Sequence, residues 1–425
     1  MVRTRARVVL SFLCGACVMA MILGSTEHMG TLAAATRYES LSLFASALQI
    51  IRKHYVEPVD ERSLVEGAVH GMLQQLDPHS AYLDPLAYKE VQIDTSGEFH
   101  GLGIEVLKRR DGFLEVVAPI EGTPAARAGI RTRDRIVAIC PVEPLAEWEG
   151  ESCRSTESMT LFEAVELLRG PKGSRITIQV DRKGFERPHP YTIVRARVKV
   201  VSVDGRLLEP GYAYVRVRSF QERTADDLRR RIAKLREESG GAFEGLILDL
   251  RDNPGGLLDQ AVQVVDLWLR EGLIVYTQGR VEARHEFTAH QGGTEAGYPM
   301  VILVNAGSAS ASEIVAGALQ DQHRALVLGT QTFGKGSVQS VYPLEEGAAL
   351  RLTTSLYYTP EGRSIQRTGV SPDIQVEATP AGEVSGVLLP EDVPLARGLE
   401  VLKSWSTFER LSDANPTVQA ARTKL

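Results

Sequence analysis

The sequence predicts an α/β fold, in which a core of alternating strands and helices follows a β-rich domain and an N-terminal helical region. Apolar strand-like runs at 243–250, 298–305 and 325–329 are separated by helical patterns. Short alternating runs fill residues 96–185. Apolar residues recur at three- and four-residue steps within 37–95. The 425 residues are enough for two to four domains.

Residues 1–36 are expected to form a signal peptide or a membrane anchor. Arg3, Arg5 and Arg7 precede an uncharged, mostly apolar run from Val8 to Leu23, which is the order typical of such segments. Cleavage and retention are both left open. In either case, the rest of the chain is expected to be exported across the cytoplasmic membrane, with membrane association through this segment left open.

Residues 37–95 are expected to form amphipathic helices. The two helical runs lie at 39–56 and 63–76. Such a pair cannot bury both of its apolar faces alone, because two helices enclose too little volume. Packing on another domain or on a second subunit is therefore expected, and a homo-oligomer formed through 37–95 is left open.

Residues 96–185 combine short β-like runs with one helix at 161–170. A loop of Gly101, Leu102, Gly103 and Ile104 leads into the first of these strands. This order resembles a PDZ domain of the bacterial protease type, in which such a loop binds a peptide's terminal carboxylate and the peptide adds as a strand. The alternative is another small β-rich domain with a glycine turn.

Cys140 and Cys153 flank a polar stretch within this region. In an exported chain, a disulfide that closes a surface loop is favoured over two free thiols.

Residues 186–380 are expected to form the core, and residues 381–425 a tail with one helix. Strands that alternate with helices imply parallel pairing, and reactive groups in such sheets gather where strands end and helices begin. Two turns occupy such positions, RDNPGG at 251–256 and NAGSAS at 305–310.

Several known functional patterns are absent or incomplete. The stretch GTQTFGKGSVQS at 329–340 nearly matches a phosphate-binding loop, but Gly336 stands where Ser or Thr would hold magnesium. His285 and His290 are one residue too far apart for a zinc-binding helix. No nucleotide, cofactor or metal is therefore expected. The net charge of −6, without a basic block, disfavours a nucleic-acid partner.

Ser310 stands at a predicted helix start directly after a buried strand. The N–H groups and the positive partial charge of a helix start stabilise a negative oxygen. Ser310 and Glu313 also match a capping box, in which the hydroxyl only caps the helix. Ser308 and Ser312 compete for either role, so these alternatives remain open from the residues alone.

Ser310 lies in the segment GSASASEI, and Lys335 lies 25 residues later in the segment TFGKGSVQ. These two segments resemble those of the carboxy-terminal processing peptidases, or tail-specific proteases. The resemblance extends over roughly residues 40–405. The other segments that carry it are LDPHSAYL, GYAYVRVRSF, GLILDLRDNPGGLLDQAV, LRLTTSLYYTPEGRSIQ and GVSPDI.

This resemblance implies a Ser–Lys dyad, with Ser310 as the nucleophile, Lys335 as the general base and Gln339 orienting the lysine. It also implies a crotonase/Clp-protease-like α/β core with an inserted PDZ domain. The oxyanion hole would be formed by the backbone N–H groups of Ala311 and of Gly255 or Gly256.

Lysine must lose its proton to act as a base. A free lysine has a pKa near 10.4, so burial has to lower it to about 7–8 for work at neutral pH. Phe333 and Val338 are the expected desolvating neighbours. Gly334 and Gly336 would let the lysine enter a tight site.

The sequence therefore predicts an exported serine endopeptidase that captures apolar C-terminal tails of proteins through its PDZ domain and cuts near the C-terminus. The resemblance also implies that the PDZ domain gates the active site. Arg169 is the candidate link between tail binding and the core, with a solvated helix-end arginine as the alternative. The rival function is a non-catalytic scaffold that binds tails.

Overall fold

The computed structural model describes residues 41–142, 152–281, 283–291, 295, 297–377, 383–384, 387–388 and 392–413. These residues divide into two compact units, one ending at Tyr82 and one beginning at Leu83. The expected signal or anchor at 1–36 lies outside the described residues. Within the described ranges, no helix combines the length and the apolar character needed to span a bilayer.

The first unit contains a helix over 41–54 and helix α2 (Glu61–Gln74). Asp60 begins α2, because its carboxylate accepts the Ser63 N–H at 3.0 Å. The helix over 41–54 leaves large apolar side chains exposed, namely Leu41, Leu43, Phe44, Ile50 and Ile51. These two helices therefore leave apolar surface uncovered, as the sequence predicts. Strand β1 (Ala81–Leu83) follows α2.

The second unit begins with helix α3 (Pro85–Ser96) and continues into a β-rich domain. Its elements are β2 (Glu98–Gly101), β3 (Ile104–Lys108), β4 (Leu114–Pro119), α4 (Pro124–Arg127), β5 (Arg135–Pro141), β6 (Arg154–Ser155), η2 (Thr156–Ser158), α5 (Leu161–Leu168), β7 (Arg175–Asp181), β8 (His189–Val194) and β9 (Ala196–Lys199). Strands β3, β4, β5, β7 and β8 form one antiparallel sheet in this order, so β3 lies at an edge.

This domain extends past the expected boundary at residue 185. Strand β8 pairs with β7, and β9 pairs with β2 at the other end of the domain. Buried Ile193 of β8 belongs to the domain's own apolar core. The alternating run after residue 185 thus completes this domain rather than opening the next one.

Cys140 and Cys153 form a disulfide, as the sequence favours.

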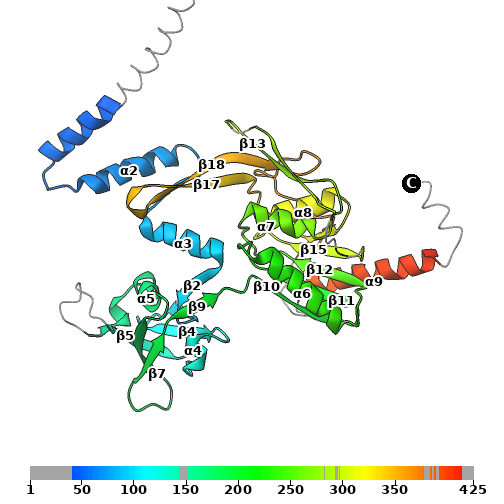
Figure 1. Cartoon of the computed structure of the whole chain (residues 1–425), viewed down its shortest axis with the longest axis horizontal. Coiled ribbons are helices and arrows are strands. Elements are labelled where there is room, and N and C mark those ends of the chain that lie inside the picture. Colours follow the sequence, from blue (N-terminus) through cyan, green and yellow to red (C-terminus); the bar gives the residue numbers. More distant parts are fainter. Residues whose placement is uncertain are drawn as a thin grey trace, which may run out of the picture. The chain divides into compact units, whose positions relative to one another are not determined.

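The core is built on a six-stranded sheet in the order β10-β11-β12-β15-β16-β19 (Figure 1). Its strands are β10 (Val203–Glu209), β11 (Tyr212–Val217), β12 (Gly245–Asp249), β15 (Met300–Val304), β16 (Leu326–Gly329) and β19 (Ile374–Gln375). Every pair from β11 onward is parallel. The predicted strands at 243–250, 298–305 and 325–329 are confirmed as β12, β15 and β16.

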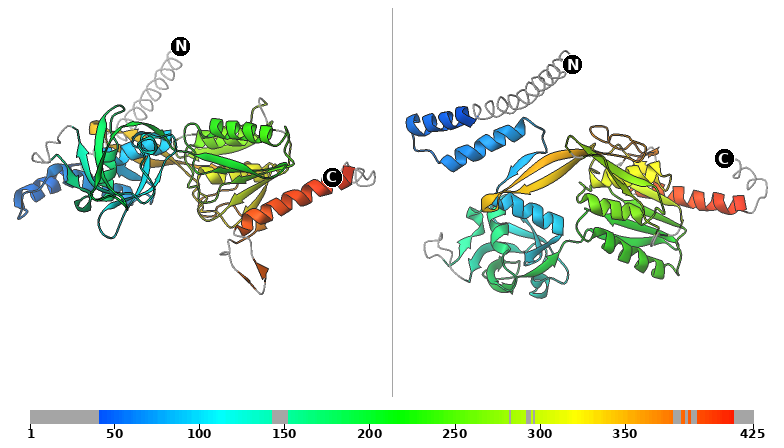
Figure 2. Two further views of the ribbon diagram at one scale, coloured as in Figure 1. Left: turned by 90° about the horizontal axis from the view of Figure 1, so that it is seen from below. Right: turned by 45° about the horizontal axis from the view of Figure 1, so that its top comes forward.

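Helices cover both faces of this sheet (Figure 2). The helices of one face are α6 (Thr224–Glu238), α7 (Leu258–Asp266) and α8 (Ala311–Asp321). The C-terminal helix α9 (Val393–Asp413) packs on the other face through residues that include buried Leu402. The predicted tail helix exists, and it is part of the core rather than an appendage.

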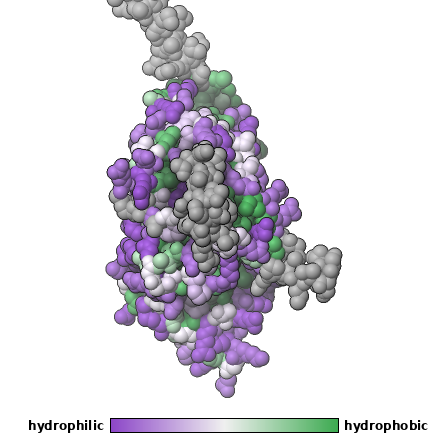
Figure 3. All heavy atoms as spheres, turned by 90° about the vertical axis from the view of Figure 1, so that its right-hand side faces the viewer, coloured by the Kyte–Doolittle hydropathy of each residue, from purple (hydrophilic) through white to green (hydrophobic). Residues whose placement is uncertain are grey.

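A second sheet of the core contains a long hairpin of β17 (Ser337–Pro343) and β18 (Ala349–Tyr358). Strand β13 (Leu273–Gly279) pairs with β18, and β14 (His285–Thr288) pairs with β13. His285 thus lies on a strand and not on a zinc-binding helix. The remaining short elements are η3 (Glu345–Gly347), β20 (Glu383–Val384) and β21 (Val387–Leu388). Hydrophilic side chains cover most of the face drawn in Figure 3, as is usual for a surface in contact with water.

Candidate active site

Ser310 lies at the junction between the turn after β15 and helix α8. Its φ is +55°, which places a residue other than glycine in a sparsely populated backbone region. Such strain gathers at functional positions, where the surrounding structure must hold it. Ser310 and Glu313 form the predicted capping box, in which the carboxylate of Glu313 accepts the Ser310 N–H at 2.8 Å.

The two neighbouring serines have structural partners. Buried Ser308 donates its hydroxyl to the Leu250 carbonyl at 2.8 Å, and buried Ser312 donates to the Asn253 carbonyl at 2.9 Å. Ser308 thus joins the turn after β15 to the turn after β12, and Ser312 joins the first turn of α8 to it. Ser310 is the one of the three that lines a cavity.

Asn253 joins the turn after β12 to the segment that carries Ser310, because its carbonyl accepts the Ser312 hydroxyl. Its carbonyl also accepts the Ala309 N–H at 3.0 Å. Its side-chain amide donates to the Val217 carbonyl at 2.9 Å, and its Oδ1 accepts the Gly255 N–H at 2.9 Å. One buried residue therefore fixes the RDNPGG turn against the turn that carries Ser310.

The two glycines of the RDNPGG turn lie where side chains do not fit. A Cβ on Gly255 would lie 2.7 Å from the Cβ of Ser310 and 3.0 Å from the Ala311 nitrogen. A Cβ on Gly256 would lie 2.2 Å from the Phe220 carbonyl oxygen. Asn253 accepts the Gly255 N–H, whereas the N–H groups of Gly256 and Ala311 donate to no described residue in the contacts between these turns.

A cavity of about 1250 Å³ brings the expected catalytic residues together. Its lining includes Ser310, Ala311, Lys335, Gln339, Gly255 and Gly256. Residues of α3 contribute another part of the wall, among them Asp94. Burial, followed by the negative charge of Glu90, raises the pKa of Asp94, although Arg169 opposes the increase. The cavity is large enough for a peptide segment.

Lys335 follows β16 in the loop that leads to β17 and is partly buried. Burial lowers the pKa of its amine, and repulsion from Arg351 lowers it further, while Glu313 acts in the opposite direction. The amine is thus shifted toward the neutral form that a general base requires.

The glycines beside Lys335 lie against the segment around Gln366 and Arg367. A Cβ on Gly336 would lie 2.5 Å from the Gln366 nitrogen, and one on Gly334, whose φ is +90°, would lie 3.0 Å from the Arg367 carbonyl carbon. Both positions therefore require glycine because of this neighbouring backbone, and the expected entry of the lysine into a tight site stays a prediction. The expected role of Phe333 is wrong, because its side chain is 61% exposed. Val338 does line the cavity.

Glu313 connects the two segments that carry Ser310 and Lys335. Its fully buried carboxylate accepts the Ser310 and Lys335 N–H groups through Oε2 at 2.8 and 2.9 Å. Its Oε1 accepts the Gly334 N–H at 2.7 Å and the Thr332 hydroxyl at 2.5 Å. The sequence indicated Glu313 only as a helix cap, because the other three donors lie 19 to 22 residues away.

Tyr357 of β18 is a site residue that the sequence did not indicate. Its hydroxyl donates to the Lys335 carbonyl and contacts the Ser310 side chain. Burial raises the pKa of this phenol well above its usual value, and the charge of Glu313 adds to the effect. Tyr357 therefore stays neutral as it lines the cavity beside Ser310. Gln339 lies on β17 at the same cavity.

Arg169 ends helix α5 of the β-rich domain and is mostly buried. It pairs with Glu90 of α3, and its guanidinium lies 5.1 Å from the centre of the Phe99 ring. Helix α3 also contributes to the cavity wall. The alternative of a solvated helix-end arginine is therefore wrong, and Arg169 joins α5 to an element of the site.

The loop from Gly101 to Ile104 leads into the edge strand β3. Leu102 is buried in the domain core beside residues of α5, and its carbonyl accepts the Ala125 N–H at 2.9 Å. Gly103 has φ +76°, and a Cβ there would lie 2.3 Å from Thr123. Leu102 thus holds this loop on the domain core. The loop lies next to the free edge of β3, which can pair with another strand.

Comparison with known proteins identifies similar chains over most of this length. The family model described as Peptidase family S41 matches residues 211–376, and that of the activating protease CtpB N-terminal domain matches residues 23–86. A carboxy-terminal-processing protease of Bartonella bacilliformis is 43% identical over 87% of this chain and 83% of its own length. The carboxy-terminal processing protease CtpA of Bacillus subtilis is 32% identical over 84% and 73%.

Among solved structures, a photosystem II D1 C-terminal processing protease is 29% identical to this chain. The match covers 84% of this chain and 95% of that protein, with a TM-score of 0.46.

Proposed function

Because this chain belongs to peptidase family S41, the carboxy-terminal processing proteases, we propose that its Ser310 and Lys335 form a Ser–Lys dyad. Ser310 is the nucleophile, Lys335 is the base that accepts its proton, and Gln339 orients the lysine. The observation that carries this proposal is that all three residues line one cavity in which the pKa of Lys335 is lowered.

In the acylation step, neutral Lys335 takes the Ser310 proton while Ser310 Oγ attacks the carbonyl carbon of the scissile bond. The carbonyl becomes an oxyanion that accepts hydrogen bonds from the N–H groups of Ala311 and Gly256. Protonated Lys335 then donates to the leaving amine, and an acyl-enzyme remains on Ser310. Water, activated by Lys335 in the same way, releases the acid. Because the Gly255 N–H already donates to Asn253, Gly256 is favoured over Gly255 as the second oxyanion-hole donor.

Substrates are recruited by their C-terminal tails. The β-rich domain acts as a PDZ domain, in which a peptide adds to the edge of β3 and its terminal carboxylate meets the loop N–H groups of Gly101, Leu102, Gly103 and Ile104. The edge position of β3 and the anchored loop support this. An apolar last residue is preferred, and the contact of Arg169 with Glu90 links tail binding to the cavity.

The core has the crotonase/Clp-protease-like arrangement, and the protein works outside the cytoplasm. The disulfide between Cys140 and Cys153 supports an oxidising compartment. The N-terminal segment directs export and associates the protein with the membrane. The exposed apolar side chains of the helix over 41–54 support a homo-oligomer formed through 37–95.

The cleavage test uses the full chain and a protein that ends in apolar residues. We expect the wild type to cut this protein near its C-terminus and to spare a copy that ends in two aspartates. Ser310→Ala is expected to show no cleavage with an unchanged melting temperature, as measured by mass spectrometry and thermal unfolding. Tail binding without cleavage by the wild type would favour the scaffold instead.

Tail capture makes a separate prediction about the carboxylate. The Ser310→Ala chain is expected to bind a fluorescent peptide with an apolar C-terminus, and amidation of that terminus should weaken binding by tenfold or more, which is about 1.4 kcal/mol. Fluorescence anisotropy measures both affinities. Equal affinities for the acid and the amide would contradict carboxylate recognition by the loop.

A further inference from the structure

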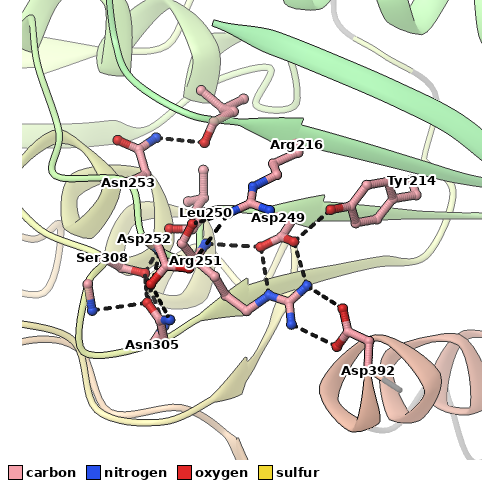
Figure 4. Close-up of polar contacts among 12 residues, drawn as sticks. Tyr214, Arg216, Asp249, Leu250, Arg251, Asp252, Asn253, Asn305, Ser308 and Asp392 are labelled. Atoms are coloured by element: carbon pink, nitrogen blue, oxygen red, sulfur yellow. Dashed lines mark hydrogen bonds and ion pairs between the residues drawn. The ribbon is translucent and has the colours of Figure 1, made fainter. Parts of the chain in front are cut away.

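Arg251 follows strand β12, and two carboxylates bind its guanidinium (Figure 4). Nε and Nη2 donate to Asp249 at 2.9 and 2.6 Å, and Nη1 and Nη2 donate to Asp392 at 2.8 Å each. Asp249 is fully buried, and the Arg251 side chain is only 15% exposed. Bidentate pairs of this kind fix orientation as well as distance. Arg251 therefore has little freedom to turn.

Asp392 brings the C-terminal helix into this cluster. Its Oδ1 also accepts the Leu395 N–H at 3.0 Å, and its carbonyl accepts the Ala396 N–H, so the residue caps α9. Burial opposes its charge, but the hydrogen bonds from Arg251 and Leu395 bring the pKa of Asp392 below its usual value. The carboxylate is thus ionised at neutral pH. Its position depends on α9, which packs on the sheet through Leu402.

Arg251 is the first residue of the RDNPGG turn. Its N–H donates to Asp249 Oδ1 at 2.9 Å, and its carbonyl accepts Arg216 Nη2 at 3.3 Å. The next residue, Asp252, has φ +57°, and its N–H donates to Asn305 Oδ1 at 2.9 Å. A rotation at Arg251 would therefore displace both the glycines that follow it and the turn before Ser310.

We propose that Asp392 is a positioning residue for the peptidase reaction: by holding Arg251 it keeps the RDNPGG turn, and hence the Gly256 N–H, in place beside Ser310. The docking of α9 thereby supports the geometry of the oxyanion hole. This inference rests on the proposed dyad. Asp392 acts through Arg251, since neither residue is among the described residues that line the cavity.

The test substitutes Asp392→Asn in the full chain. Asparagine keeps the size and the acceptor for the Leu395 N–H but loses the charge that holds Arg251. We expect kcat to fall by about tenfold or more, because small displacements of reacting groups are costly, while KM stays within about twofold. The rate at which a fluorophosphonate labels Ser310 should fall in parallel.

Glu400→Gln is the matched control. It makes the same carboxylate-to-amide change on α9, at an exposed position that pairs with Arg397. We expect wild-type values of kcat, KM and labelling rate for this variant. The proposal would be overturned if Asp392→Asn lost kcat and also melted at a lower temperature, because that combination would indicate general destabilisation.

Hydrogen exchange provides a readout that does not depend on activity. Amides of residues 250–257 are expected to exchange faster in Asp392→Asn than in Glu400→Gln or the wild type. Wild-type exchange and wild-type kcat in Asp392→Asn would overturn the proposal. If Ser310→Ala still cuts, the dyad is wrong, but the exchange experiment still decides whether Asp392 holds the turn.

Discussion

Replacing Lys335 with methionine is expected to abolish cleavage and to leave the fold intact. Methionine fills a similar space but carries no base, so Ser310 keeps its proton and the rate should fall by about 10⁴-fold. The melting temperature near neutral pH should not fall, because burial disfavours the protonated amine in the folded state and its removal relieves that cost. Peptide cleavage and thermal unfolding measure the two effects.

The same lysine sets the pH dependence of the reaction. Below the pKa of Lys335 the amine is protonated and cannot act as a base, so kcat/KM should rise as the pH increases through that value. Because burial and Arg351 both lower the pKa, this rise should lie below the ordinary pKa of lysine, which is about 10.4. Arg351→Gln removes the repulsion and should move the rise to higher pH.

Two outcomes would contradict this role of Lys335. One is cleavage by Lys335→Met at a rate near that of the wild type. The other is a pH–rate profile that rises only at the pKa of a free lysine, since that would mean an amine without effective burial. An unchanged pH–rate profile in Arg351→Gln would show only that Arg351 does not lower the pKa of Lys335.

The parallel core was predictable because its strands are buried on both faces. Every residue of β12 and β15 is buried, so β15, and β12 as far as Asp249, read as apolar runs, and the polar turns that follow mark the edge where reactive groups lie. The boundary at 185 was not predictable in this way. The alternating pattern of β8 resembles that of any half-exposed strand, and only its pairing with β7 assigns it to the β-rich domain.

The site was predictable where a motif carries it and unpredictable where distant segments meet. Without the family resemblance, the residues did not separate Ser308 and Ser312 from Ser310; their buried contacts with Leu250 and Asn253 do. Asp392 lies 141 residues from Arg251 in the chain, so no local pattern joins them. Phe333 was expected to cover Lys335 because it is apolar and near in sequence, but its backbone directs the side chain into solvent.

Glu313→Gln is expected to weaken both the fold and the reaction. The carboxylate accepts four hydrogen bonds, two on each oxygen. An amide replaces one oxygen by an NH₂ group, which would face either the Ser310 and Lys335 N–H groups or the donors of Gly334 and Thr332. Donors left without an acceptor in a buried site are costly, so the free energy of unfolding should fall by about 3–5 kcal/mol.

The effect on catalysis follows from the same geometry. One oxygen of Glu313 accepts the backbone N–H groups of both Ser310 and Lys335. Without the carboxylate, the distance between these two residues is no longer fixed. We expect kcat to fall by about 10²-fold or more with KM little changed. Chemical denaturation and steady-state cleavage measure the two quantities.

Two further variants keep this prediction testable if Glu313→Gln does not fold. Thr332→Val removes one of the four donors together with the acceptor of the Val370 N–H, and should lower stability by a smaller amount, about 1–2 kcal/mol, with a smaller loss of kcat. Glu345→Gln makes the same change as Glu313→Gln at an exposed position and should match the wild type. If Glu313→Gln folds with wild-type stability and kcat, Glu313 does not hold the two catalytic segments together, and the spacing of Ser310 and Lys335 must be set by the β17–β18 hairpin and Tyr357 instead.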